Sequence, residues 1–93
     1  MIIGACSVYM TAGWSRSLKE KRSEVKSLIG RAKNKFNISI AEIEDMDSHK
    51  KIAIGFACVS NETRHADSVI RNVLRFIESS TDARVDDVVI EFL

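Results

Sequence analysis

Hydrophobic residues alternate with other residues near the start of the chain. Between residues 2 and 11 the even positions include Gly4, Cys6, Val8 and Met10, and the odd positions form a second, more mixed series. A period of two is typical of a β-strand, because its successive side chains point to opposite faces. The sequence therefore predicts a first strand whose even positions face the core.

Two later segments have the 3.6-residue period of amphipathic helices. The first opens at the capping box Ser17-Leu18-Lys19-Glu20 and is expected to end near Lys35. The second follows Ser60-Asn61, whose side chains are candidate helix caps. Its apolar stripe consists of Ala66, Val69, Ile70, Val73, Leu74 and Ile77. The chain should therefore contain two helices, each with one face against a core.

Three further segments are rich in the residues that strands favour. Residues 37–43 are interpreted as an edge strand with a bulge, residues 50–59 as a strand whose bulky face meets the helices, and residues 84–93 as the last strand. The resulting order βαββαβ predicts an α+β fold, the ferredoxin-like sandwich, in which a four-stranded antiparallel sheet carries both helices on one face.

Length and composition are those of one soluble globular domain. Two domains within 93 residues would each lack a sufficient core, so residues 1–93 are expected to form a single unit. No apolar run approaches the roughly 20 residues of a membrane helix, and the first residues lack a basic signal segment. A cytoplasmic location is expected. Cys6 and Cys58 lie in apolar runs without metal or redox spacing, so buried free thiols are predicted.

Positive charge is concentrated in the first helix. Residues 16–35 contain eight basic and two acidic residues, whereas residues 62–93 have a net charge of −3. Five cations form the candidate nucleic-acid-binding surface: Arg16, Lys19, Arg22, Lys26 and Lys33. The last four lie within about 60° of one another on a helical wheel, beside the apolar stripe. Such a row can follow phosphates without reading sequence, although a solvated helix face would show the same pattern.

Aromatic residues do not support a stacking platform for RNA. Residues 55–59 superficially resemble the motif of an RNA-recognition domain, but alternation turns Phe56 toward the core. Tyr9 remains as the one candidate on the outer sheet face, and a single aromatic residue is a weak platform. Trp14, in the loop before the first helix, is either a loop anchor or an extension of the basic surface.

The outer sheet face carries mostly small and fairly apolar side chains, and a second copy of the chain would bury it. Its candidate interface residues are Ile3, Ala5, Tyr9, Ala53, Ala57 and Val59. A homodimer is therefore expected, with a half-exposed sheet in a monomer as the alternative.

Neither a catalytic nor a metal site is predicted. The acidic residues between positions 42 and 47, followed by His49, match no known metal-binding loop, and a solvated hairpin turn is favoured. His65 lacks a nucleophile and an orienting group at a defined spacing. We therefore expect a protein that is not an enzyme and has no cofactor.

Several short motifs are similar to one bacterial family. The run Ser17-Leu18-Lys19-Glu20-Lys21-Arg22, with Met1-Ile2-Ile3-Gly4 before it and residues 36–42 after it, resembles the YlxP-like family of unknown function. Val59-Ser60-Asn61 and Glu91-Phe92-Leu93 extend the resemblance over nearly the whole chain. It implies a ferredoxin-like fold and a gene neighbourhood shared with transcription elongation and ribosome-maturation factors, but no activity.

Charge and family context lead to one hypothesis and one alternative. The hypothesis is a small binding module that associates with RNA or a ribonucleoprotein through the first helix and the Trp14 loop. The alternative is a homo-oligomeric scaffold or a ligand-binding regulator that uses the open sheet face.

Overall fold

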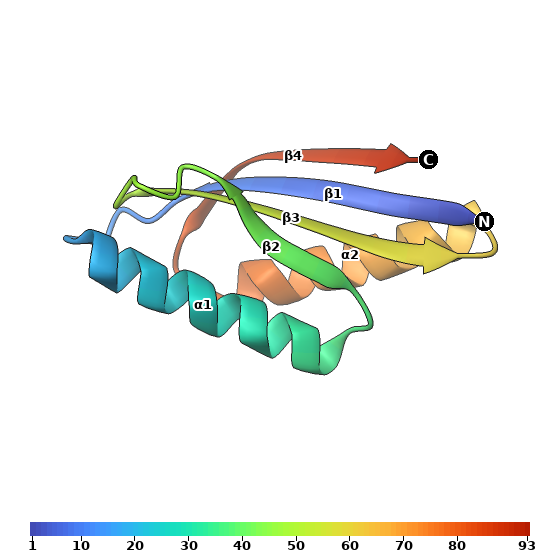
Figure 1. Ribbon diagram of the computed structural model, residues 1–93, viewed down its shortest axis with the longest axis horizontal. Coiled ribbons are helices and arrows are strands. Elements are labelled where there is room, and N and C mark those ends of the chain that lie inside the picture. The colour runs from blue at the N-terminus through green and yellow to red at the C-terminus, as the bar shows by residue number, and fades with distance from the viewer.

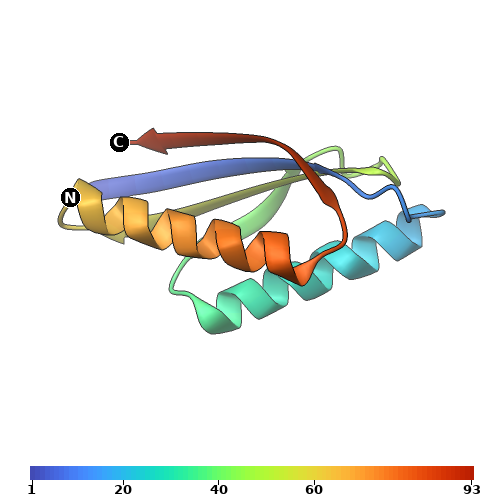
Figure 2. The ribbon, with the colours of Figure 1, turned by 180° about the vertical axis from the view of Figure 1, so that it is seen from behind.

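Six elements follow one another in the predicted order. The computed structural model describes residues 1–93 and contains β1 (Ile2–Thr11), α1 (Leu18–Lys35), β2 (Ser39–Glu44), β3 (Lys51–Ser60), α2 (Thr63–Ser80) and β4 (Arg84–Phe92). The strands form one antiparallel sheet in the order β2-β3-β1-β4. Both helices lie on the same side of this sheet and leave its other face open (Figures 1 and 2). The ferredoxin-like α+β fold is therefore confirmed.

The core lies between the helices and the even positions of β1 and β3. Val8, Met10, Ile52 and Ile54 have almost no exposed surface, and they belong to one cluster with the apolar stripes of both helices. Phe56 is part of this cluster, as its alternation predicted. The bulky face of β3 thus meets the helices.

Gly4 allows α2 to approach β1 closely. A Cβ atom at Gly4 would lie 2.9 Å from Cδ1 of Ile70 and 3.2 Å from Cβ of Ala66. Helix α2 therefore packs against the backbone of β1 at this point, and any side chain would push the two elements apart.

The two helices begin differently. Ser17 is the N-cap of α1, and its hydroxyl accepts a hydrogen bond from the Glu20 backbone N–H at 3.1 Å, as predicted. Helix α2 has Glu62 at its N-cap without a side-chain cap, so the prediction that Ser60 and Asn61 cap it was wrong. Ser60 still belongs to β3, and its hydroxyl accepts a hydrogen bond from the Glu62 N–H instead. Neither helix combines the length and apolar composition of a membrane-crossing segment.

Strand β2 is an edge strand with a bulge, as predicted. The register shifts between Glu42 and Glu44, so Ile43 is the extra residue. The Ile43 side chain lies over Gly55, where an added Cβ would come within 2.9 Å of its Cγ2 atom. The bulge therefore places an apolar side chain on the outer side of the sheet.

Both cysteines are buried free thiols, as predicted. Gly4 pairs with Cys58 and Cys6 pairs with Phe56, so the two thiols occupy diagonal positions on neighbouring strands. Diagonal neighbours in a sheet are about 7–8 Å apart, which is longer than the usual Cα separation in a disulfide. Burial raises the pKa of the Cys6 thiol to about 11, so this residue remains protonated at neutral pH.

Candidate nucleic-acid interface

One cation of α1 lies inside the protein. The Lys21 side chain has no exposed surface, and its ammonium group donates to Oε2 of Glu42 at 2.8 Å and to the backbone carbonyl of Asp45 at 2.9 Å. A buried charge requires such partners. The positive charge of α1 that reaches the surface is therefore one unit smaller than the residue count indicates.

The acidic segment between β2 and β3 lies beside α1. Asp45 has a positive φ of 59°, which turns the chain so that its carbonyl can accept from Lys21. Asp47 then lies 3.4 Å from the Arg22 guanidinium, in a pair that is largely exposed to water. The acidic residues of this segment thus pair with basic residues of α1. No group of three or more His, Cys, Asp or Glu residues is arranged to hold a metal ion.

Three lysines of the candidate surface are exposed and have no ion-pair partner. They are Lys19, Lys26 and Lys33. Arg16 is also exposed, in the loop before α1, and Arg22 retains about half of its side-chain surface. The structure therefore keeps all five predicted cations at the surface, with Arg22 partly neutralised by Asp47.

A groove borders this row of cations on the side of the β2–β3 hairpin. Its volume is about 480 Å³. The lining residues are Arg22, Val25, Lys26, Ile29, Glu42 and Met46. Its surface thus combines apolar side chains with two cations and one carboxylate.

Trp14 anchors the loop that precedes α1. Its ring packs against the edge of the hydrophobic core. The Lys50 ammonium group fixes the same loop by donating to the backbone carbonyls of Gly13 and Ser15, at 3.1 and 2.9 Å. Of the two interpretations of Trp14, the structure favours the loop anchor.

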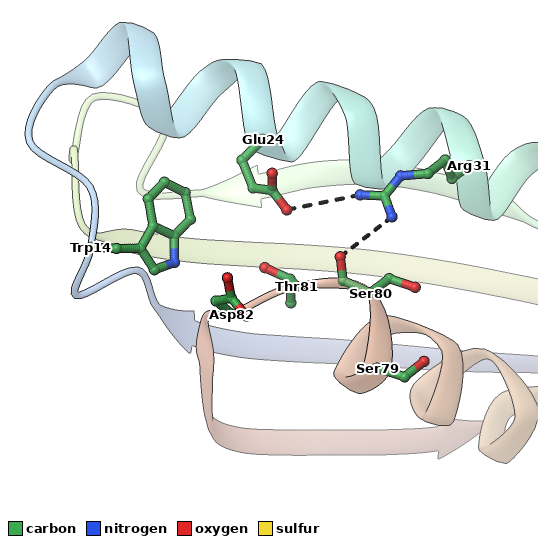
Figure 3. Close-up of a pocket in the computed structure, with 7 residues that line it drawn as sticks. All are labelled: Trp14, Glu24, Arg31, Ser79, Ser80, Thr81 and Asp82. Carbon is green, nitrogen blue, oxygen red and sulfur yellow. Dashed lines mark hydrogen bonds and ion pairs between the residues drawn. The ribbon is translucent and has the colours of Figure 1, made fainter.

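A second cleft, of about 350 Å³, lies between Trp14, α1 and the α2–β4 connection (Figure 3). Arg31 lies 3.8 Å from a Glu24 carboxylate oxygen and donates to the Ser80 carbonyl at 3.3 Å, so its charge is already used within the cleft. Asp82 adds a second carboxylate, and the indole Nε1 of Trp14 is buried without a partner. The cleft is acidic overall, so the side of the Trp14 loop that faces it does not continue the basic row.

The outer sheet face is apolar at one end and polar at the other. At the end where the chain termini meet, Ile3 pairs with Val59 in β3 and exchanges two backbone hydrogen bonds with Leu93. Val59 and Leu93 are 68% and 69% exposed, so these three residues form an apolar row across the sheet. Ala5, Tyr9 and Ala57 are partly exposed on the same face.

Ala53 does not contribute to that face, contrary to its proposed place in an interface. It has no exposed surface, because it pairs with Tyr9 on one side and with Glu44 on the other, and both neighbours carry larger side chains.

The opposite end of the outer face is polar. Thr11 donates a hydrogen bond to Asp86 and accepts one from the Lys51 ammonium group at 3.1 Å. Arg84 donates to the other oxygen of Asp86 at 2.7 Å. The hydrogen bonds from Thr11 and Arg84 lower the pKa of Asp86 below its ordinary value. These groups therefore satisfy one another's hydrogen bonds.

Comparison with known sequences assigns the chain to a family. Residues 3–90 match the family model described as "Protein of unknown function (DUF503)". The chain belongs to this family. It is also 41% identical, over 63 residues, to "Uncharacterized protein YlxP" of Bacillus subtilis (strain 168), a match that covers 68% of each chain. The resemblance to the YlxP-like family is confirmed, and DUF503 membership by itself names no activity.

Proposed function

We propose that the chain is a small binding module that holds RNA, free or within a ribonucleoprotein, by its phosphate backbone along α1. The observation that carries this proposal is the row of exposed lysines without acidic partners, Lys19, Lys26 and Lys33. From the helical rise of 1.5 Å per residue, the row is about 21 Å long. Nonspecific contacts of this kind typically give dissociation constants of about 10⁻⁴ to 10⁻⁶ M.

Salt dependence is the expected signature of this binding. For single-stranded nucleic acid the slope of log K against log salt is about −0.7 for each phosphate neutralised. Four contacts, from the three lysines and Arg22, would give a slope of about −2.8. Affinity should then fall about 50-fold between 50 and 200 mM salt.

The test compares two variants with the same change in charge. One carries Lys19→Glu, Lys26→Glu and Lys33→Glu on α1, and the control carries Arg64→Glu, Arg71→Glu and Arg75→Glu on exposed positions of α2. Fluorescence anisotropy with a labelled single-stranded RNA should show loss of binding and of the salt slope in the first variant only. Circular dichroism checks that both fold. An equal loss of RNA affinity in the two variants would mean that binding depends only on the net charge of the protein, and it would refute the proposal.

The open sheet face supports a second candidate, a homodimer used as a scaffold or regulator. The apolar row formed by Val59, Ile3 and Leu93 carries it, since two of these side chains are more than 60% exposed. A dimer should have about twice the 10.4 kDa mass of the chain in light scattering. The double variant Val59→Asp and Leu93→Asp should return it to 10.4 kDa. A wild-type mass of 10.4 kDa at micromolar concentration would rule this candidate out.

A further inference from the structure

The groove between α1 and the β2–β3 hairpin has a composition that phosphate binding alone does not require. Its apolar surface comes from Val25, Ile29 and Met46. Met46 is 48% exposed and lies in an otherwise acidic turn. The surface beside the lysine row therefore offers an apolar contact in addition to charge.

The groove also contains a fixed hydrogen-bond acceptor. Glu42 lines it, and its Oε2 atom accepts from the buried Lys21 ammonium group at 2.8 Å. Its Oε1 atom has no hydrogen-bond partner within the chain, so one carboxylate oxygen is left for a ligand. Because Lys21 and the backbone of β2 hold the side chain, this acceptor is oriented before any ligand arrives.

We infer that the groove receives the base of one unpaired nucleotide of a bound RNA. The base lies on Val25, Ile29 and Met46, a base N–H group donates to Oε1 of Glu42, and the flanking phosphates contact Arg22 and Lys26. This inference rests on the proposed function and specifies its partner as single-stranded RNA.

Charge favours this occupant over a neutral apolar segment of a protein. The two cations at the groove attract a chain that carries a negative charge at each unit. The Glu42 carboxylate in the same groove can accept from the exocyclic amino group of cytosine. Uracil presents carbonyl oxygens beside its N–H group, so cytosine should be preferred to uracil.

The decisive measurement separates apolar from ionic contacts through the salt slope. Met46→Ser removes the exposed thioether side chain without changing charge, and Ser68→Ala on exposed α2 is the control for a neutral exchange. Anisotropy titrations with oligo(C), oligo(U) and an RNA duplex of equal length should be made at several salt concentrations. The groove has no aromatic residue, so its contact with one base should contribute at the lower end of the range for base stacking. The expected loss of RNA affinity in Met46→Ser is therefore about fivefold.

The inference predicts that wild type binds oligo(C) several-fold more tightly than oligo(U) or the duplex. Met46→Ser should weaken oligo(C) binding about fivefold at every salt concentration and leave the slope unchanged. Lys26→Glu should instead reduce the slope by about 0.7. Identical binding of wild type and Met46→Ser, or equal affinity for duplex and single strand, would overturn the inference while leaving phosphate binding intact. No binding to any RNA would refute the proposed function itself.

Discussion

Exchanging Glu42 for methionine should destabilise the fold more than exchanging its partner Lys21 for the same residue. The two side chains form one ion pair, but their burial differs: Lys21 is 0% exposed and Glu42 is 18% exposed. In Glu42→Met the ammonium group stays in the interior with the Asp45 carbonyl as its one remaining hydrogen-bond partner. Removing one partner of a buried pair typically costs about 3–5 kcal/mol.

In Lys21→Met the group left behind is the carboxylate, which water can reach. The expected cost is about 1–3 kcal/mol, since one carboxylate and the Asp45 carbonyl each lose a hydrogen bond. The double variant with methionine at both positions contains no unpaired charge, so it should be more stable than Glu42→Met alone. For a domain of this size 1 kcal/mol changes Tm by about 5 °C, so Glu42→Met should lower Tm by about 15–25 °C.

Urea and thermal unfolding, followed by circular dichroism, measure all three variants against wild type. The order of stability should be wild type, Lys21→Met, Glu42→Met, with the double variant above Glu42→Met. If the double variant is as unstable as Glu42→Met, or if the two single variants are equal, the assignment of the cost to a stranded buried ammonium group is wrong.

Three further predictions concern other parts of the molecule. Gly4→Ala should lower the free energy of unfolding by about 1–3 kcal/mol, because the added Cβ pushes α2 away from β1. At Gly30 an added Cβ meets nothing within 4 Å, so Gly30→Ala should stabilise α1 by roughly 0.5–1 kcal/mol. Equal urea midpoints for the two variants would contradict this. Because the folded pKa of Asp86 lies below its ordinary 3.8, the carboxylate contributes stability above about pH 4 and loses it as pH falls through the folded pKa. The difference in unfolding free energy between wild type and Asp86→Asn should therefore vanish in acid, and a difference independent of pH would count against it. A thiol reagent at pH 8 should label neither Cys6 nor Cys58 until the protein is unfolded. Rapid labelling of the native protein would disprove their burial.

The alternation of residues was sufficient to predict the sheet and its core face. Val8 and Ile54 are buried because a strand with helices on one side must turn every second side chain toward them. The Ser17 cap was equally predictable, since its hydroxyl satisfies a backbone N–H group that the helix leaves free. These features depend on local spacing, which the sequence contains directly.

The burial of Lys21 was missed, although the sequence contains a signal for it. Lys21 precedes Val25 by four residues and Leu28 by seven, so it occupies the apolar side of α1. The candidate surface left Lys21 out, but the charge count of residues 16–35 included it without distinguishing buried from exposed cations. Its partners Glu42 and Asp45 come from a hairpin that meets α1 only in the folded chain, and that contact requires the bulge at Ile43 and the positive φ of Asp45.

The burial of Ala53 could not be read from the sequence for a related reason. Alternation placed it correctly on the outer side of β3, but its exposure depends on which residues lie beside it. The bulge shifts the register of β2 so that Glu44, rather than the residue before it, pairs with Ala53. A register is a relation between two segments, and it follows from packing rather than from either segment alone.

The central place of β1 in the sheet has a consequence for how the chain folds. This strand is made first, but its partners are β3, which ends at residue 60, and β4, which ends at residue 92. Both of its pairings close long loops, and such non-local pairings slow folding relative to helical domains of the same size. During synthesis the apolar strand β1 must therefore wait, unpaired, until most of the chain has emerged, which makes this interval the time of greatest exposure to aggregation.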